Sequence, residues 1–163
     1  MSEGAPGSPE DILPVAVHAC ALVIGETGIL IRGKSGAGKS SLVLALLDAA
    51  ARRNLFARLV ADDRVCLHMA GDRLLAAPHP AIAGLIEERG TGILSVPHES
   101  CVRISYVIDL VQSGGATNHP ARLPEEADLT TRIGPICLRR LILPADLPPD
   151  AAARRILGFF NDA

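Results

Sequence analysis

The sequence is poor in aromatic residues and contains no tryptophan. One tyrosine and three phenylalanines occur among 163 residues, so aliphatic side chains must supply most of the buried surface. An excess of charge of one sign is also missing, because 16 lysines and arginines nearly balance 18 aspartates and glutamates. This balance gives no electrostatic reason to expect a nucleic-acid partner.

Cysteine pairs at metal-ligand spacing are absent as well. The four cysteines, Cys20, Cys66, Cys101 and Cys137, lie far apart in the sequence. Neither a zinc site nor a disulfide framework is indicated, and reduced structural thiols are expected.

Long hydrophobic runs are missing too. Residues 1–10 contain Gly, Pro, Ser and acidic residues where a secretory signal needs a basic and then an apolar segment. No apolar run approaches the roughly 18 residues of a membrane helix. We therefore expect a cytoplasmic protein without a membrane partner, folded as one domain over residues 15–163 behind a flexible segment, 1–14.

The segment after residue 14 predicts a β-hairpin. Residues 15–24 and 29–31 are β-branched and apolar, and residues 25–28, Gly-Glu-Thr-Gly, form a turn. A helix is expected over 40–53, directly after a glycine-rich loop. An ordinary mononucleotide-binding fold opens with a single strand that leads into this loop, whereas here that strand is the second arm of a hairpin.

The rest of the sequence predicts a mixture of strands and helices, which makes the fold class α/β. Strands are expected over 55–61, 65–69, 74–76, 93–96, 102–110 and 133–143. Helices are expected over 81–88 and 151–160, and a loop over 112–124.

The glycine-rich loop satisfies the complete Walker A pattern, with Gly33, Lys34, Ser35, Gly36, Ala37, Gly38, Lys39 and Ser40. Glycines let backbone N–H groups point inward, and the following helix adds its positive end. We expect a solvent-facing Lys39 to reach the β and γ phosphates of a nucleoside triphosphate, and the Ser40 hydroxyl to bind Mg²⁺.

Three further features are candidates for catalysis. Asp62 and Asp63 follow an apolar strand, so that one could hold Mg²⁺ and the other accept a proton, unless the pair is a polar turn. His18 lies in an apolar segment, either as an interior residue or as a hydrogen-bond partner of one of these carboxylates. Residues 87–92, Glu-Glu-Arg-Gly-Thr-Gly, offer acids for a metal and a cation for phosphate, or mark an exposed helix end.

Together these segments resemble the catalytic domain of the HPr kinase/phosphorylase family, bacterial enzymes that phosphorylate a serine of the phosphocarrier protein HPr. Four segments carry the resemblance in order: residues 17–19 around His18, the loop 33–40, residues 59–65 with their two aspartates, and residues 86–93. The resemblance runs from about residue 15 to 143. It implies a P-loop kinase domain with a mixed sheet, of the HPr kinase/PEP carboxykinase type.

The resemblance also implies roles for single residues. His18 would be the catalytic histidine, and Glu87 would bind Mg²⁺ together with Ser40. The acid pair would include the general base, for which Asp63 is favoured over Asp62.

A catalytic arginine is implied as well. Arg122, in Ala-Arg-Leu-Pro, is similar to an arginine that the family places in an Asp-Arg-Leu-Gly setting. The implied reaction transfers the γ-phosphoryl group of ATP to HPr or a related carrier. The implied assembly is a homo-oligomer, in the family a hexamer.

Two departures from the family pattern bear on function. Longer members carry an N-terminal domain ahead of the histidine strand, so the resemblance is to a short form. The family's Pro-Val-Arg-Pro-Gly-Arg segment, tied to dephosphorylation, would fall near residues 143–149, which contain neither arginine nor glycine. The sequence therefore predicts a kinase with weak or absent phosphorylase activity.

Two other functions stay open at this point. One is a regulatory nucleotide-binding module, which the acid pair and His18 disfavour. The other is a small-molecule P-loop kinase in which Arg132, Arg139 and Arg140 belong to a closing lid. The hairpin ahead of the loop disfavours the second.

Overall fold

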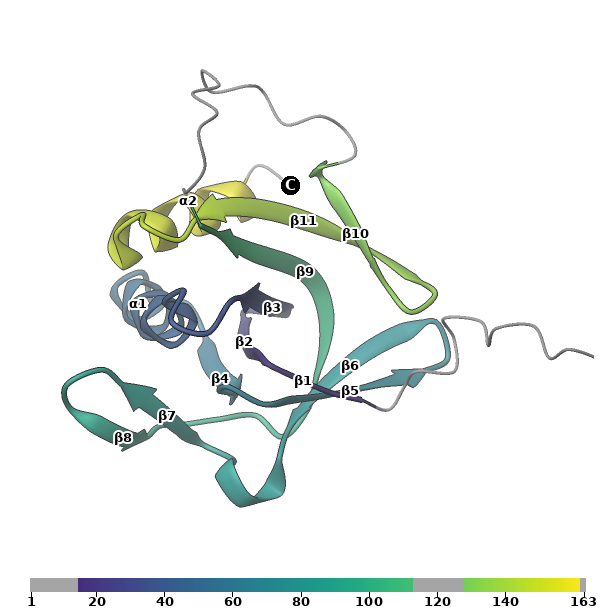
Figure 1. Ribbon diagram of the computed structural model, residues 1–163, viewed down its shortest axis with the longest axis horizontal. Helices are drawn as coiled ribbons and strands as arrows, with labels where there is room; N and C mark the ends of the chain where they lie inside the picture. The colour runs from purple at the N-terminus through teal and green to yellow at the C-terminus, as the bar shows by residue number, and fades with distance from the viewer. Residues whose placement is uncertain (1–14, 113–127, 162–163) are drawn as a thin grey trace, which may run out of the picture.

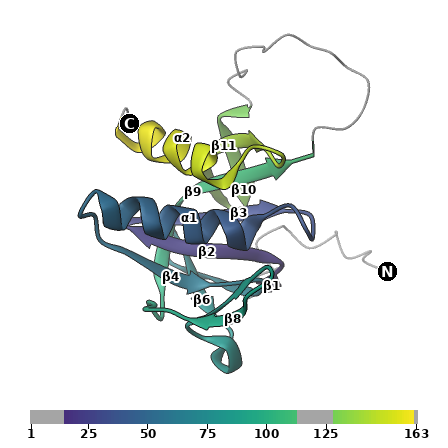
Figure 2. The same cartoon turned by 90° about the vertical axis from the view of Figure 1, so that its left-hand side faces the viewer.

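The computed structural model describes residues 15–112 and 128–161. In these ranges a strongly curved sheet carries helix α1 (Lys39–Arg52) and helix α2 (Pro149–Asn161) on the same face (Figure 1). The two helices lie side by side in a second view (Figure 2). The sheet is mixed, because β3 runs antiparallel to β2 and parallel to β9. The predicted α/β class with a mixed sheet is confirmed.

Nine strands of the described residues form this sheet. They are β1 (Val15–Val17), β2 (Ala19–Ile24), β3 (Thr27–Gly33), β4 (Ala57–Ala61), β5 (Val65–Ala70), β6 (Arg73–Pro78), β9 (Val102–Val111), β10 (Thr130–Ile133) and β11 (Ile136–Pro144). Their order is β1-β5-β6-β9-β3-β2-β4, with β11 also paired to β9 and β10 beyond it. The start of β9 pairs with β6, and the rest runs parallel to both β3 and β11.

A small separate hairpin follows β6. It consists of β7 (Leu85–Glu88) and β8 (Gly92–Ser95), preceded by a short 3-10 helix, η2 (Pro80–Ile82). This hairpin lies beside the start of α1, which places it near the glycine-rich loop (Figure 1).

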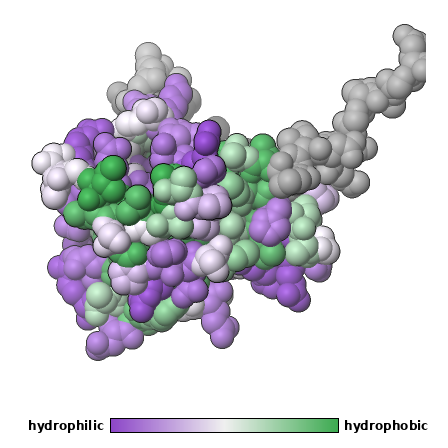
Figure 3. Space-filling model, turned by 90° about the horizontal axis from the view of Figure 1, so that it is seen from below, coloured by the Kyte–Doolittle hydropathy of each residue, from purple (hydrophilic) through white to green (hydrophobic). Residues whose placement is uncertain are grey.

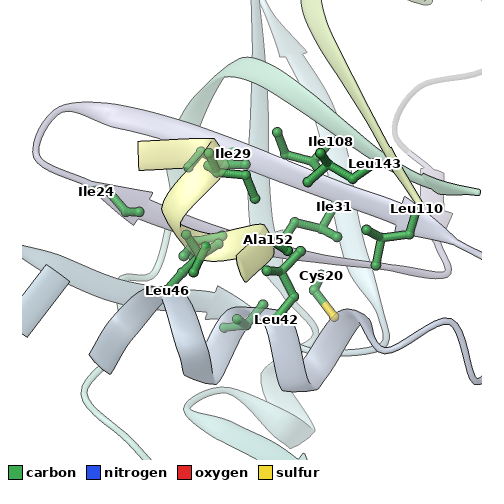
Figure 4. Packing of buried hydrophobic residues seen from close by; sticks show 14 of the residues in the cluster. Cys20, Ile24, Ile29, Ile31, Leu42, Leu46, Ile108, Leu110, Leu143 and Ala152 are labelled. Atoms are coloured by element: carbon green, nitrogen blue, oxygen red, sulfur yellow. The ribbon is translucent and has the colours of Figure 1, made fainter. Parts of the chain in front are cut away.

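Alternation of side chains along the central strands divides the core in two. Ile31 and Ile108 point toward Leu46 and the helices, in the cluster drawn in Figure 4. Leu30 and Val107 point to the opposite face, where β5 and β6 cover them. Strand β2 is buried along its whole length because both of its faces are covered. Strand β3, which leads into the loop, pairs with this buried strand on one edge and with β9 on the other.

The hairpin predicted at the start of the domain is present. Strands β2 and β3 pair from Ala19 with Arg32 to Ile24 with Thr27, and β3 leads into the loop before α1. The strand predicted over 15–24 is interrupted at His18, however. As a result, β1 pairs with β5 while β2 pairs with β3 and β4.

One further prediction of secondary structure, the helix over 81–88, is wrong. Residues 81–88 form η2 and β7 instead of a helix, because Gly84 has a positive φ of 75° and residues 85–88 pair with β8. Ile86 is buried within this hairpin while Glu87 is exposed, which is the alternation of a strand. The strand predicted over 133–143 is present as β11 from residue 136, while residue 133 ends β10 and the hairpin β10–β11 turns at Gly134 with a φ of 57°.

One buried carboxylate joins three adjacent strands. Asp109 on β9 accepts hydrogen bonds from Arg32 Nε at 2.7 Å and Arg32 Nη2 at 2.8 Å. It also accepts one from Arg140 Nε at 2.6 Å. Burial alone would raise the pKa of Asp109, but hydrogen bonds and charge from Arg32 and then Arg140 outweigh it and lower the pKa. This cluster ties the end of β3, directly before the loop, to β9 and, across β9, to β11.

We expect Asp109→Asn to lower the free energy of unfolding by roughly 1.5–3 kcal/mol at pH 7, because the hydrogen bonds it removes are to a charged group. Since the folded-state pKa lies below the unfolded one, this contribution is present above the unfolded pKa. It is lost as the pH falls through the folded-state pKa. Urea unfolding at pH 7 and at successively lower pH should therefore show a shrinking difference from the wild type.

The matched control is Asp48→Asn, which removes an exposed ion-pair partner of Arg52 one turn away on α1. We expect a change of less than about 0.5 kcal/mol, as for other surface pairs. Equal losses in the two variants, or a loss in Asp109→Asn that does not depend on pH, would contradict the interpretation.

Candidate functional site

The loop between β3 and α1 has the shape of a phosphate cradle. Gly36 and Gly38 have positive φ values of 80° and 91°, which glycine adopts without strain. Gly38 is the N-cap of α1, and Ala37 N–H donates to Lys34 O at 3.0 Å. The backbone therefore curls around the positive end of the helix, where anions bind readily.

Lys39 is the first residue of α1, and its side chain turns back into the loop. Its Nζ donates to Gly33 O and Lys34 O, both at 2.9 Å. The residue is only 6% exposed, so the expectation of a solvent-facing Lys39 is wrong. The loop itself covers the side chain, which still lines the cavity described below.

Asp62 lies directly after β4 and is fixed by three donors. Ser40 Oγ donates to Asp62 Oδ1 at 2.6 Å, and Cys20 Sγ donates to the same oxygen at 3.1 Å. Glu87 N–H donates to Asp62 Oδ2 at 3.0 Å. The carboxylate is buried and pairs with the loop serine, an arrangement in which P-loop proteins bind Mg²⁺.

Cys20 contributes to the site, although sequence analysis treats it as an ordinary structural thiol. Burial, and next the neighbouring Asp62 carboxylate, raise the pKa of Cys20 to about 12. The thiol therefore keeps its proton at neutral pH and can donate it in the hydrogen bond to Asp62. The sequence does carry a signal that Cys20 belongs to the site: it lies two residues after His18, and alternate residues of an extended chain share a face.

Asp63 points away from Asp62, because the chain turns sharply between them. Its φ is 64°, and Arg64 N–H donates to Asp62 O at 2.7 Å, which makes a three-residue turn centred on Asp63. Aspartate tolerates this region better than most residues. The exposed Asp63 carboxylate forms a hydrogen bond through Oδ1 with His18 Nε2.

His18 lies at the break between β1 and β2. Its side chain is 48% exposed, so it is not an interior histidine. Of the two predicted roles, interior residue or hydrogen-bond partner of an aspartate, the structure has the second, and the partner is Asp63.

A cavity of about 300 Å³ brings these groups together. We call it the catalytic cavity; it is lined by His18, Asp63, Lys39, Ser40 and Glu87, among others. Arg89, in the turn between β7 and β8, also lines it; it is the cation that the sequence offered for phosphate within residues 87–92. The cluster Glu-Glu-Arg-Gly-Thr-Gly was the signal for it. The predicted Arg122 lies outside the described residues.

The site suits a metal ion that is bound partly by protein oxygen atoms and partly by the phosphates of a bound nucleotide. In the described ranges no group of three or more His, Cys, Asp or Glu side chains could hold a metal ion by itself. Mg²⁺ is usually bound through one or two carboxylates together with phosphates and water. Ser40, Asp62 and Glu87 offer oxygen atoms of this kind next to the loop.

The arginines considered for a lid do not form one. Arg140 is bound to Asp109, and Arg139 stacks on Tyr106 and Phe159 at 5.4 Å from each ring centre. Arg132 Nη2 donates to Pro135 O at 3.1 Å, within the hairpin β10–β11. These contacts fix all three arginines on strands, which disfavours the small-molecule kinase.

Neither helix of the described residues is long and apolar enough to cross a membrane. This finding bears on α1 and α2, whose lengths are 14 and 13 residues.

Known proteins are similar to this chain in sequence and in fold. The HPr kinase/phosphorylase of Mycoplasma mycoides subsp. mycoides SC is 40% identical over 79 residues, which cover 48% of this chain and 23% of that protein. The enzyme of the same name from Neisseria meningitidis serogroup C is 35% identical over 98 residues, covering 58% and 29%. The matches thus span less than a third of the length of these relatives.

The structure of the Hpr(Ser) kinase/phosphatase from Coxiella burnetii matches with a TM-score of 0.72 and 25% identity, over 91% of this chain and 97% of that chain. A family model described as HPr Serine kinase C-terminal domain matches residues 13–143. The chain therefore belongs to the HPr serine kinase C-terminal domain family.

Proposed function

We propose that the chain is an ATP-dependent protein kinase domain that phosphorylates a serine of an HPr-like phosphocarrier protein. The observation that carries this proposal is the His18–Asp63 pair, which lines the same cavity as Lys39 and the glycine-rich loop. Membership of the family supports HPr as the class of acceptor. The cytoplasmic location and the hexamer stay predictions from the sequence.

The donor phosphates would lie in the loop 33–40. Lys39 and the loop N–H groups would bind the β and γ phosphates, and Ser40 and Glu87, with Asp62, would hold Mg²⁺. Bound Mg²⁺ supplies positive charge that offsets the charge developing on the transferred group.

Asp63 is proposed as the general base in preference to Asp62. Asp62 is 6% exposed and its two oxygens accept three hydrogen bonds, so an incoming hydroxyl would have to displace a donor. The Asp63 side chain is 71% exposed and lines the cavity. With the proton assigned to His18 Nε2, the imidazole donates to Oδ1 and orients the carboxylate, so that Oδ2 can accept the serine proton.

The surface beside the cavity favours a protein as acceptor. Ile93 pairs with Glu87 across the hairpin β7–β8 and is 71% exposed. Ile82 in η2, the turn that precedes this hairpin, is 36% exposed. Figure 3 views the molecule from the side of these elements and shows hydrophobic residues grouped among hydrophilic ones. Large exposed apolar residues next to a polar site are typical of protein contacts.

The direct test is transfer from γ-labelled ATP with Mg²⁺. We expect the label on a serine of HPr and not on small-molecule acceptors. Lys39→Ala should lower transfer by roughly 10²–10³-fold or more, as when a preorganised charge-stabilising donor is removed. The control is Arg52→Ala, which removes an exposed cation in the last turn of α1, outside the loop and outside the lining of the catalytic cavity.

Each other outcome of this assay has a distinct meaning. Wild-type transfer by folded Lys39→Ala, with folding checked by circular dichroism, would contradict the Walker A assignment. Label on a small molecule would favour a small-molecule kinase. ATP binding without transfer to any acceptor would favour a regulatory module.

A second prediction separates His18 and Asp63 from ATP binding. We expect His18→Ala to lower kcat by about 10²-fold or more, in the range of general-base catalysis, while the Kd for Mg-ATP stays within about twofold. Asp63→Asn should act similarly, and the double variant should lose little more, because the two residues act as a unit. Weaker ATP binding with unchanged turnover would indicate that His18 has a structural role instead.

A third prediction concerns the reverse reaction, in which phosphate attacks phosphoserine and releases serine and pyrophosphate. Two anions must then be held together, which needs added positive charge. Residues 143–149 contain one acid, Asp146, and no cation, and several of them lie beside Gly36 and Ala37 of the loop. We therefore expect little pyrophosphate from phosphorylated carrier with excess phosphate and Mg²⁺, under conditions of rapid forward transfer.

Rapid release of pyrophosphate in that assay would contradict the prediction. It would mean that another cation supplies the missing charge, and Arg89 is the first to test because it lines the catalytic cavity. Lys39→Ala serves as the negative control, because both directions need the phosphate loop.

A further inference from the structure

A second cavity lies on the other side of the glycine-rich loop. Its volume is about 190 Å³, and it shares Gly36, Gly38, Ser41 and Arg89 with the catalytic cavity. The two cavities therefore meet over the loop and the first turn of α1. Together they form one path across the residues proposed to bind phosphate.

The direction of the triphosphate along this path follows from the chemistry. The transferred γ-phosphoryl group must lie in the catalytic cavity, where Asp63 and His18 face the acceptor. The β and α phosphates then continue over the loop amides and the start of α1. The group attached to the α phosphate must leave on the side away from Asp63, where the second cavity opens beside Ser41 and Leu42.

The walls of the second cavity suit a nucleoside. Leu110 at the end of β9 lines it, together with Pro144, Ala145 and Leu147 after β11. Among the described residues that line it, none is acidic and Arg89 is the charged one. Nucleotide sites are mostly apolar with few polar groups, so that these aliphatic side chains can cover a flat base and its ribose.

The wall is also held in place. Ala145 N–H donates to Val111 O at 2.7 Å, and Leu147 N–H donates to Pro144 O at 3.2 Å. Ala152 of α2, buried at 3% exposure, closes the cavity from the helix side. A preformed wall of this kind binds a ligand without the cost of ordering it first.

We propose that the second cavity binds the nucleoside of the phosphoryl donor, and that residues 144–152 complete the donor site. The proposal rests on the proposed function only in that the γ-phosphoryl group occupies the catalytic cavity. The family match ends at residue 143, so most of this wall lies in the part of the chain that the family model does not cover.

The test compares ATP with tripolyphosphate, which has the phosphates but no nucleoside, by titration calorimetry of the full chain with Mg²⁺. In the wild type, ATP should bind at least roughly tenfold more tightly than tripolyphosphate, since burial of the nucleoside adds affinity. This comparison needs no variant. Equal affinities for the two ligands would overturn the proposal.

Variants then locate the nucleoside. Ala145→Phe should fill the cavity, so that the affinity for ATP falls to that for tripolyphosphate while the latter changes less than about twofold. Leu147→Gln is a milder change at a half-buried position and should weaken ATP selectively as well. Ala70→Phe, at an exposed alanine that ends β5 and lines neither cavity, is the matched control.

The possible failures can be told apart. Equal losses of ATP and tripolyphosphate in folded Ala145→Phe would overturn the nucleoside site. A selective loss of ATP in a chain that transfers no phosphoryl group would keep the nucleoside site and contradict the kinase. Lys39→Ala should weaken both ligands, which checks that they use the same loop.

Discussion

The arrangement of the site depends on one buried carboxylate, that of Asp62. Its donors come from three separate segments: Ser40 at the start of α1, Cys20 in β2 and the Glu87 N–H in β7. Burying a carboxylate is costly unless its oxygens are hydrogen-bonded, so losing any one donor would destabilise this contact. Because each segment must reach the same two oxygen atoms, the glycine-rich loop, the β2–β3 hairpin and the β7–β8 hairpin are fixed relative to one another. The chemistry can then rely on neighbours that are far apart in the chain.

The same constraint explains why two adjacent aspartates can serve different purposes. Asp62 is held in the structure, and the sharp turn at Asp63 sends the next carboxylate in another direction, into the cavity. A residue in this backbone region costs on the order of 1–3 kcal/mol, which the surrounding contacts must offset. The Arg64–Asp62 backbone hydrogen bond and the contact with His18 are two such contacts. The break between β1 and β2 belongs to this arrangement, because it places His18 outside both ladders and free to turn toward Asp63.

Features that depend on neighbours in the chain could be predicted from the sequence, and those that depend on distant residues could not. The loop 33–40 and the hairpin before it are local patterns, and both are found. Residues 81–88 have a composition that suits a helix, but pairing with β8 makes them strand, and only the partner strand decides this. The burial of Lys39 and the contact of Cys20 with Asp62 likewise need the folded loop. The roles of His18, Asp63 and Glu87 stay predictions, as does that of Arg122, which lies outside the described residues.

The two cavities give the proposed reaction a direction. On one side of the loop lie the acids and His18; on the other, aliphatic residues after β11 form the wall, and Arg89 lines both cavities. A nucleoside on that wall would anchor the donor at the end that does not react, so binding energy from a remote group positions the γ-phosphoryl group for transfer. Inorganic phosphate has no such group, and residues 143–149 offer it no cation. In the proposed site, the same stretch of chain would favour a nucleoside triphosphate as donor and disfavour free phosphate as attacking group. Both effects would bias the proposed reaction toward phosphorylation.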